Sequence, residues 1–260
     1  MRFTCAGNTD VGVVRTGNED NFLVDHQHGV FIVADGMGGH AAGEVASDMA
    51  VAMIGKEMNG IRNLSDAAAS ERMGEAIRGA NAAIFDRTLA EHDKRGMGTT
   101  VTVMVLFAKR YLIGQVGDSR AYLFRDGEFT QITKDHSYVQ EQVDAGLLTP
   151  DQARTHPYSN VITRCVGANE EVVPDIYYGR IRTGDIILLA SDGLTGMLED
   201  THLATILQTE GGPDSWVDRM IADANRRGGL DNITAIIVRI DEVDPNTGEH
   251  RAPVAAAGRA

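Results

Sequence analysis

The feature that most restricts the fold is a block of alternating residues that begins at Thr99. In its first part, TTVTVMVLF, valines alternate with Thr, Met and Leu, so both faces of the strand are largely apolar. A strand with two apolar faces belongs to a sheet that is covered on both sides, by another sheet or by helices. This block therefore predicts a buried layer in the middle of the molecule.

The segments that follow continue the alternation and are separated by short breaks. RYLIGQVG and SRAYLFRDGEFTQIT come next. The breaks between strands are expected to be hairpin turns, and they fall at Ala108-Lys109, Gly117-Asp118 and Asp126-Gly127. The whole block predicts an antiparallel meander, in which Asp126-Gly127 serves only as a tight turn.

The rest of the chain places strands and helices in separate runs. Strands are expected near residues 21–24, 30–34, 161–166, 172–180, 185–190 and in the final segment NITAIIVRI, and helices near 43–58, 65–92, 199–209 and 213–227. Such runs, in place of strict alternation of strand and helix, are typical of an α+β fold. We expect one domain over residues 1–240 and a flexible tail over 241–260, which lacks apolar periodicity.

Composition and charge argue against several classes of partner. The 260 residues include 24 Lys and Arg against 37 Asp and Glu, and this acidic balance disfavours nucleic acid, whose phosphates require basic residues. No apolar run approaches the roughly 18–20 residues of a membrane span. The first ten residues lack a basic region followed by an apolar stretch, so we expect no secretion leader, and we likewise expect no membrane association. Cys5 and Cys165 are the two cysteines, which fits a reducing cytoplasm and excludes a disulfide scaffold.

Aspartates beside apolar strands carry the strongest chemical signal. Asp35 ends the strand in VFIVADG, Asp192 ends the strand in IILLASDG, and Asp231 comes just before the final strand. Because an isolated buried carboxylate is costly, such groups are usually paired, hydrogen-bonded or bound to metal. Oxygen ligands on separate loops, without His or Cys, suit a hard divalent cation such as Mg²⁺ or Mn²⁺. Taken alone, however, an Asp-Gly dipeptide is more typical of an ordinary turn.

The order of several short motifs favours the metal site over the turns. RTGNED, DGMGGH, GMGTT, GDSR, SDG and DN follow one another between about Gly7 and Ile240. In this order they resemble the metal-dependent type 2C (PPM) protein serine/threonine phosphatases, in their compact bacterial form. The resemblance implies a four-layer αββα fold, in which a central sandwich of two antiparallel β-sheets is flanked by helix pairs. It also implies an enzyme that hydrolyses phosphoserine and phosphothreonine on proteins.

The resemblance assigns the acidic residues to two metal ions, Mn²⁺ or Mg²⁺. Asp35 looks like the carboxylate that bridges both ions, and the carbonyl of Gly36 looks like a ligand of one of them. Asp192 and Asp231 resemble the acidic ligands of the other ion. Asp118, together with Asp192, resembles the site of a third and weaker metal that bacterial members carry.

Other residues match the family's solvent and substrate contacts. Glu19 and Asp20 match a pair that holds water at the metals, and Arg15 matches the arginine that binds phosphate. A planar guanidinium fork suits two-point contact with a phosphoryl group. Some members carry a histidine directly after the Asp-Gly, where this chain has Met37. His40, in GMGGH, is then the candidate for substrate contact or for proton donation to the leaving group.

The resemblance also implies partners and a moving part. The polar stretch 133–160 falls where bacterial members carry a mobile flap over the active site. Phosphorylated proteins are the implied substrates, so a cognate Ser/Thr kinase and its targets are the expected partners. We expect the chain to act as a cytoplasmic monomer.

Two functions of other kinds remain as alternatives. The segment VFIVADGMGGHAAGE has the strand, glycines and helix of a dinucleotide-binding motif, although Asp35 precedes its first glycine. A metal-binding pseudophosphatase that acts as a regulatory module would keep the same carboxylates. A cysteine-dependent phosphatase is disfavoured, because neither Cys5 nor Cys165 is followed by Arg at the sixth position.

Overall fold

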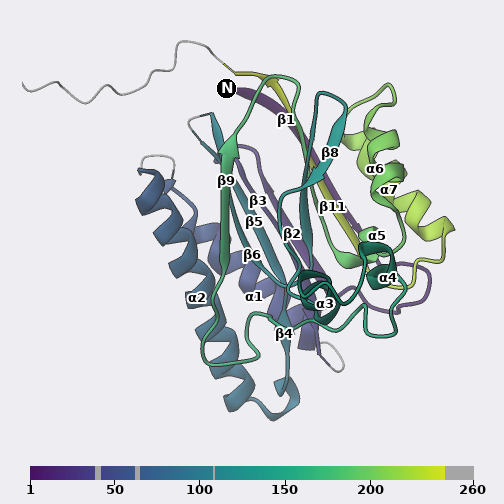
Figure 1. Cartoon of the computed structure of the whole chain (residues 1–260). Helices are drawn as coiled ribbons and strands as arrows, with labels where there is room; N and C mark the ends of the chain where they lie inside the picture. Colours follow the sequence, from purple (N-terminus) through teal and green to yellow (C-terminus); the bar gives the residue numbers. More distant parts are fainter. Residues whose placement is uncertain (39–41, 62–64, 108, 244–260) are drawn as a thin grey trace, which may run out of the picture.

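Two antiparallel β-sheets packed face to face form the centre of the computed structural model, which describes residues 1–38, 42–61, 65–107 and 109–243 (Figure 1). The five-stranded sheet has the order β1 (Arg2–Asp10), β11 (Ile233–Glu242), β10 (Ile186–Ala190), β7 (Arg120–Arg125) and β8 (Glu128–Gln131). The six-stranded sheet has the order β2 (Asp20–Asp25), β3 (Val30–Met37), β5 (Val101–Phe107), β6 (Arg110–Val116) and β9 (Asp175–Arg180), with β4 (Gly98–Thr99) paired to β3.

Helices cover the outer face of each sheet. On the six-stranded sheet lie α1 (Ala42–Glu57) and α2 (Asp66–Ala90), and on the five-stranded sheet lie α6 (Asp200–Leu207) and α7 (Pro213–Arg226) (Figure 1). The connections contain the short elements η2 (His92–Lys94), α3 (Tyr138–Asp144), α4 (Pro150–Arg154) and α5 (Asp192–Thr195). This arrangement confirms the expected four-layer αββα fold.

Strand β5 shows why the layers stack in this way. All of its residues are buried. Val103 and Val105 belong to the core under α1 and α2, whereas Met104 and Leu106 belong to the core between the sheets. Successive side chains of a strand point to opposite faces, so one strand supplies two cores. The prediction of a sheet covered on both faces is confirmed.

The meander prediction is wrong at one of its three breaks. Asp126 and Gly127 have φ values of 53° and 87°, as a two-residue hairpin between β7 and β8 requires. Gly117, in contrast, lies between β6 and β7, which belong to different sheets. Its φ is +104°, and a Cβ there would lie 2.6 Å from Cβ of Thr100. The Gly117-Asp118 break therefore carries the chain from one sheet to the other and is not a hairpin turn.

The strand predicted over residues 161–166 is also wrong. The segment makes two isolated bridges, from Ile162 to Ser137 and from Val166 to Thr99. Because its backbone pairs with two separate partners, one residue at a time, no continuous ladder forms.

Strand β1 and the end of β11 were not evident from the sequence pattern. In β1 one residue, Phe3, is buried, so the strand lacks the alternation that would reveal it. It pairs with β11 along its whole length, and the pairing of Arg2 with Glu242 extends β11 beyond Ile240. The expected tail therefore begins as strand, and residues 244–260 lie outside the described residues.

The topology also removes the dinucleotide-binding alternative. Strand β3, which precedes the glycine-rich segment, is antiparallel to β2, β4 and β5. A dinucleotide-binding unit requires parallel strands joined by a crossover helix. Within the described residues, no helix is both long enough and apolar enough to cross a membrane.

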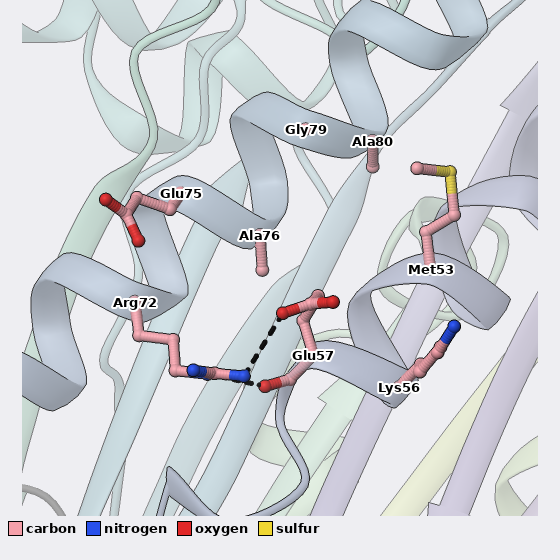
Figure 2. A pocket seen from close by; sticks show the side chains of 8 residues that line it. All are labelled: Met53, Lys56, Glu57, Arg72, Glu75, Ala76, Gly79 and Ala80. Atoms are coloured by element: carbon pink, nitrogen blue, oxygen red, sulfur yellow. Dashed lines mark hydrogen bonds and ion pairs between the residues drawn. The ribbon is translucent and has the colours of Figure 1, made fainter.

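Two cavities lie away from the strand ends that carry the predicted carboxylates. One, of about 330 Å³, lies between α1 and α2, where Arg72 binds the backbone and side chain of Glu57 (Figure 2). The other, of about 400 Å³, is lined by the start of α2 and by residues of β6 and β9, including Tyr178. Neither cavity contains a predicted site residue, so the candidate site must be built from the carboxylates themselves.

Candidate metal centre

Five aspartates from both sheets meet at one end of the sandwich. Asp20 and Asp35 lie opposite each other in the pairing of β2 with β3. Asp192 and Asp231 flank β10 and β11, and Asp118 lies in the crossover between the sheets. Their charges act on one another, since the pKa of Asp35 is raised by Asp20, Asp192 and Asp118 and that of Asp20 by Asp192 and Asp231. The structure thus brings together the predicted metal ligands.

The backbone of Asp35 is held by the threonines of the GMGTT motif. Its N–H donates to Oγ1 of Thr100 at 3.0 Å. Its carbonyl accepts from the backbone N–H of Thr100 at 2.8 Å and from Oγ1 of Thr99 at 2.9 Å. Oγ1 of Thr100 also lies 2.8 Å from Oγ of Ser119 in the GDSR motif. Three motifs that are distant in the sequence therefore fix the position of one carboxylate.

Gly36 allows three chain segments to meet beside Asp35. A Cβ at this position would lie 2.2 Å from the carbonyl oxygen of Gly43 in α1 and 2.5 Å from that of Glu19. The N–H of Gly36 donates to the Glu19 carbonyl at 3.1 Å. Burial raises the pKa of Glu19, although the backbone N–H of Gly43 opposes the shift. Glu19 therefore lies at the edge of the cluster, next to the strand end that carries Asp35.

Asp20 is buried with one satisfied oxygen and one unsatisfied oxygen. Its Oδ2 accepts hydrogen bonds from Oγ of Ser191 at 2.9 Å and from Oγ1 of Thr234 at 2.6 Å. Its Oδ1 is buried and has no hydrogen-bond partner. Burial, reinforced by the charges of Asp192 and Asp231, raises the pKa of Asp20 to about 7. An anionic Asp20 at neutral pH therefore needs a nearby positive charge.

Asp192 repeats this pattern from the opposite sheet. Its Oδ1 is also buried without a partner, and burial raises its pKa. The next residue, Gly193, fits tightly, because a Cβ there would lie 1.9 Å from the carbonyl oxygen of Asn232. This close approach places the Asp192 turn directly against the turn that carries Asp231.

Asp35 and Asp118 complete the crowded interior of the cluster. Burial raises the pKa of Asp35 well above its usual range, and the neighbouring carboxylates raise it further. Burial likewise raises the pKa of Asp118, with added repulsion from Asp192 and Asp135. Four acids with elevated pKa values in one place, of which Asp20 and Asp118 are buried and Asp35 and Asp192 partly buried, are costly unless a cation neutralises them.

The donor set fits a hard divalent cation. The fit rests on two buried carboxylate oxygens without partners, on Asp20 and Asp192, and on the mutual repulsion of their neighbours. Carboxylate oxygens are the preferred ligands of Mg²⁺ and Mn²⁺. Across the residues that the structure describes, no three acidic, His or Cys side chains already stand at metal-ligand spacing. The fit is thus one of chemistry and charge.

Arg15 lies at the rim of the cluster. Its side chain is about half exposed, and its terminal nitrogen lies 2.7 Å from Oδ2 of Asp231. A guanidinium has five N–H donors, so this ion pair leaves others free to bind an anion from solvent. His40, the other predicted catalytic residue, lies outside the described residues.

Asn232 is a positioning residue that the sequence did not reveal. Its Oδ1 accepts from the backbone N–H of Glu19 at 2.8 Å. Its Nδ2 donates to the carbonyls of Val11 and Gly17, each at 2.9 Å. One buried amide therefore holds the loop that carries Arg15 and Glu19. A polar side chain directly after Asp231 and before an apolar strand is the signal that could have identified it.

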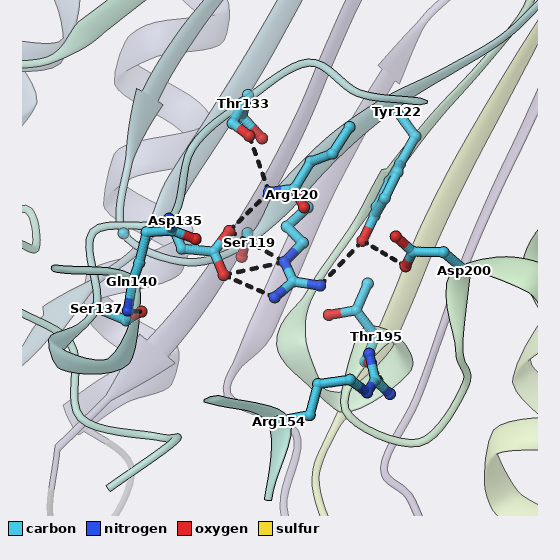
Figure 3. Close-up of polar contacts among 12 residues, drawn as sticks. Ser119, Arg120, Tyr122, Thr133, Asp135, Ser137, Gln140, Arg154, Thr195 and Asp200 are labelled. Atoms are coloured by element: carbon cyan, nitrogen blue, oxygen red, sulfur yellow. Dashed lines mark hydrogen bonds and ion pairs between the residues drawn. The ribbon is translucent and has the colours of Figure 1, made fainter. Parts of the chain in front are cut away.

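A second polar network connects the site to the segment 133–160 (Figure 3). Arg120 of the GDSR motif binds both carboxylate oxygens of Asp135, with its closest contact at 2.7 Å, and the hydroxyl of Tyr122 at 3.1 Å. In α4, Arg154 donates to the carbonyl of Thr195 at 3.3 Å, in the short helix that begins with Asp192. The segment expected to be a flap therefore contacts the elements that carry the acidic cluster.

Comparison with known proteins agrees with this geometry. The family model described as "Protein phosphatase 2C" matches residues 14–230. The serine/threonine protein phosphatase PstP of Mycobacterium tuberculosis is 39% identical over 252 residues, covering 97% of this chain but 47% of that protein. This chain thus spans about half of that relative's length. The protein phosphatase PhpP of Streptococcus pneumoniae is 37% identical over 240 residues, covering 91% of this chain and 97% of that protein.

Solved structures show the same similarity. The crystal structure of the Mycobacterium tuberculosis phosphatase PstP superposes with a TM-score of 0.86 at 38% identity, covering 92% of this chain and 99% of that one. The catalytic domain of PstP in complex with two manganese ions superposes with a TM-score of 0.83 at 36% identity, over 92% and 99% of the two chains.

Proposed function

The chain belongs to the protein phosphatase 2C family, and from this premise we propose how its acidic cluster performs the family's reaction. It is a metal-dependent serine/threonine phosphatase, an enzyme that hydrolyses phosphate monoesters on proteins. The observation that carries the assignment to this site is the pair of unpartnered buried oxygens, on Asp20 and Asp192, inside a cluster of five aspartates. Mn²⁺ or Mg²⁺ is the cofactor.

The roles that we propose for the individual carboxylates are those that the family resemblance implies. Asp35, in the middle of the cluster, would bridge two ions, with the carbonyl of Gly36 on one ion and Asp192 and Asp231 on the other. Two such ions, when bound, supply an activated water and positive charge at the phosphoryl oxygens. Asp118 lies beside Asp192 and would contribute to a third, weaker site.

Asp20 and Glu19 match the pair that holds water at the metals in the family, and we propose the same role for them here. Asp20 already accepts two hydrogen bonds through Oδ2, so its free Oδ1 would hold solvent or a metal ligand in place. Glu19 is less buried and lies between Gly43 and the Asp231 side of the cluster. The two residues would hold in place the solvent that is bound at the metals.

Arg15 would bind the phosphoryl group. It lies at the solvent edge of the cluster, where Asp231 fixes one of its nitrogens. The remaining donors of the fork can contact two phosphoryl oxygens and stabilise the charge that develops on them in the transition state. This role predicts a substrate that enters from the Arg15 side.

His40 stays the candidate general acid. A phosphothreonine leaves as an alkoxide and benefits from a proton, whereas p-nitrophenolate leaves without one. The variant His40→Ala should therefore lower kcat on a phosphothreonine peptide far more than on p-nitrophenyl phosphate. Equal losses on the two substrates would remove the general-acid role.

The remaining alternative, a metal-binding pseudophosphatase, finds no support in the comparisons, because the matched relatives carry the names of phosphatases. We further propose a monomer that acts in the cytoplasm and reverses a cognate Ser/Thr kinase. The two unpaired cysteines, Cys5 and Cys165, support a reducing compartment.

The direct test is hydrolysis of p-nitrophenyl phosphate and of a phosphothreonine peptide by the purified chain. Both reactions should require Mn²⁺ or Mg²⁺ and should stop in excess EDTA. Asp185→Asn provides a control for a buried aspartate outside the cluster and should keep the metal requirement. Full activity in metal-free buffer would overturn the proposed function.

A further inference from the structure

Three exposed aliphatic residues lie on the two chain segments that carry Arg15 and Asp231, which form an ion pair. Val13 is 66% exposed, Val14 is 59% exposed and Leu230 is 58% exposed. Val13 and Val14 directly precede Arg15, and Leu230 directly precedes Asp231. Single exposed aliphatic residues are common on protein surfaces. Here, however, three of them lie on two loops that converge on the arginine assigned to phosphate binding.

Backbone contacts hold the two loops in register. The N–H groups of Val13 and Val14 both donate to the carbonyl of Gly229, at 2.8 and 3.2 Å. A Cβ on Gly229, where φ is +49°, would lie 2.8 Å from Cγ2 of Val13. On the other side of Val13, a Cβ on Gly12 would lie 2.3 Å from the carbonyl oxygen of Asp231. The aliphatic side chains are therefore presented from a fixed base, with little ordering left to occur on binding.

The chemistry of a phosphoprotein substrate matches this surface. A phosphorylated residue must place its phosphoryl group at Arg15, so the substrate's backbone has to pass over the neighbouring loop residues. In an extended segment, residues two positions apart point to the same side, and each residue advances the chain by roughly 3.3 Å. A side chain two positions from the phosphorylated residue then reaches the surface formed by Val13, Val14 and Leu230.

We propose that Val13, Val14 and Leu230 form an aliphatic subsite, which takes a Leu, Ile, Val or Met side chain two positions from the phosphoserine or phosphothreonine of an extended protein segment. The proposal rests on the proposed function, because it requires the phosphoryl group at Arg15. The subsite would give the enzyme a preference for certain residues near the phosphorylated one, whereas the metal site contacts only the phosphate.

The test compares phosphothreonine peptides that differ in one residue. The host peptide has serine at positions −2 and +2, and two variants carry leucine at one of these positions. With Mn²⁺, one leucine peptide should have a kcat/KM about 5- to 20-fold above that of the host, as expected for partial burial of one aliphatic side chain. The variants Val13→Ser and Leu230→Ser should each reduce this leucine-to-serine ratio toward one.

Two further substitutions serve as matched controls. Leu89, in the last turn of α2, is 66% exposed, and Val173, before β9, is 70% exposed. Leu89→Ser and Val173→Ser should keep the leucine preference of the unmodified enzyme. Because the readout is a ratio between peptides, a general loss of activity through Arg15 or Asp231 cancels.

The outcomes separate the subsite from the proposed function. If p-nitrophenyl phosphate and all the peptides are hydrolysed with Mn²⁺ but leucine gives no advantage at either position, the subsite is overturned and the phosphatase stands. If no substrate is hydrolysed, both are overturned. If sedimentation shows a dimer that Leu230→Ser dissociates, and the leucine preference is absent, the surface joins two copies of this chain and the subsite is again overturned.

Discussion

The two ends of strand β10 carry aspartates whose surroundings differ in kind, Asp185 being buried and Asp192 partly buried. Before the strand, Asp185 receives hydrogen bonds from two nitrogens of Arg125, at 2.8 and 2.6 Å, and from the backbone N–H of Arg182 at 2.6 Å. After the strand, Asp192 has a buried oxygen without any partner and lies among other acids. Five apolar residues separate these two environments.

The difference shows at which end of the strand the fold leaves a carboxylate charge that a bound ligand has to neutralise. At Asp185 the protein supplies its own cation, so the carboxylate is neutralised without a ligand, and removing either partner would be costly. Asp135 beside Arg120 is a second example of the same solution. At Asp192 the charges of Arg120 and Arg15 do not offset burial, since the pKa stays raised, so a bound cation would complete the neutralisation. Buried acids with satisfied partners are thus structural in this protein, whereas buried acids with missing partners mark the reactive end.

The largest expected effect is a contrast between asparagine substitutions at the two ends. Asp192→Asn should lower kcat by on the order of a thousandfold or more with little loss of stability, because it removes a metal ligand and relieves repulsion. Asp185→Asn should keep the activity and cost about 3 kcal/mol of unfolding free energy, because it leaves Arg125 unpaired. Turnover on p-nitrophenyl phosphate and urea unfolding measure the two quantities. Equal losses of activity in the two variants would contradict the distinction between the two ends of β10.

The next effect concerns the pH dependence of the metal-free protein. The pKa of Asp20 is raised to about 7 in the folded state, above the value of roughly 3.9 for an unfolded aspartate. The folded state therefore binds more protons, so stability should fall as the pH rises from about 4 to 7.

Urea midpoints in EDTA measure this slope, to which Asp20 alone should contribute on the order of 3 kcal/mol over that range. Asp20→Asn should reduce the slope, while the raised pKa values of Asp35, Asp118 and Asp192 maintain the remainder, and Asp185→Asn should leave the slope unchanged. Saturating Mn²⁺ should reverse the trend near neutral pH, because the metal requires ionised ligands. An EDTA midpoint that increases with pH would contradict the account of the unsatisfied end.

A smaller effect is expected from Arg15, a half-exposed cation at the reactive end. The loss of a charge-assisted hydrogen bond costs about 1.5–3 kcal/mol, which corresponds to a roughly 10- to 150-fold lower kcat/KM. Arg15→Ala should act mainly through KM, and Arg15→Lys should recover part of the loss, since lysine lacks the fork. If Arg15→Ala changed neither parameter, phosphate binding would have to involve another residue.

The smallest effect should come from Asp118. It lies beside Asp192 in the crossover between the sheets and would serve the third, weaker metal. Asp118→Asn should change turnover by less than the Asp192 substitution and should leave two tightly bound ions. Loss of both ions in a metal-binding titration of this variant would show that the site has no such hierarchy.

The sequence predicts the sandwich well where the residues of a single strand show which of its faces are buried. The two apolar faces of β5 require cover on both sides, and the structure supplies it. The sequence fails at β1, because its single buried residue gives no alternation, and at Gly117-Asp118, because a hairpin and a crossover use the same residues. Whether a strand remains in its sheet depends on contacts with distant residues, which no local pattern contains.

The candidate site likewise has residues that the sequence predicts and residues that it does not predict. The sequence identifies Asp35 and Asp192 as candidate ligands because each lies at the end of an apolar strand. The order of the motifs then identifies Asp20, Asp118 and Asp231 as further candidates. The residues that position them stayed hidden: Thr99, Thr100, Ser119, Ser191, Thr234 and Asn232. Each acts through a partner far away in the chain, so its role appears only in three dimensions.

The most direct test of the account is the number of Mn²⁺ ions that the full chain binds at pH 7.5, measured by calorimetric titration and by metal analysis after gel filtration. The unmodified chain and Asp185→Asn should each retain two tightly bound ions. Asp35→Asn, which removes the carboxylate that would bridge the pair, should retain fewer than two. Two tight ions in Asp35→Asn would contradict the central claim that the acidic cluster at this end of the sandwich holds the metals.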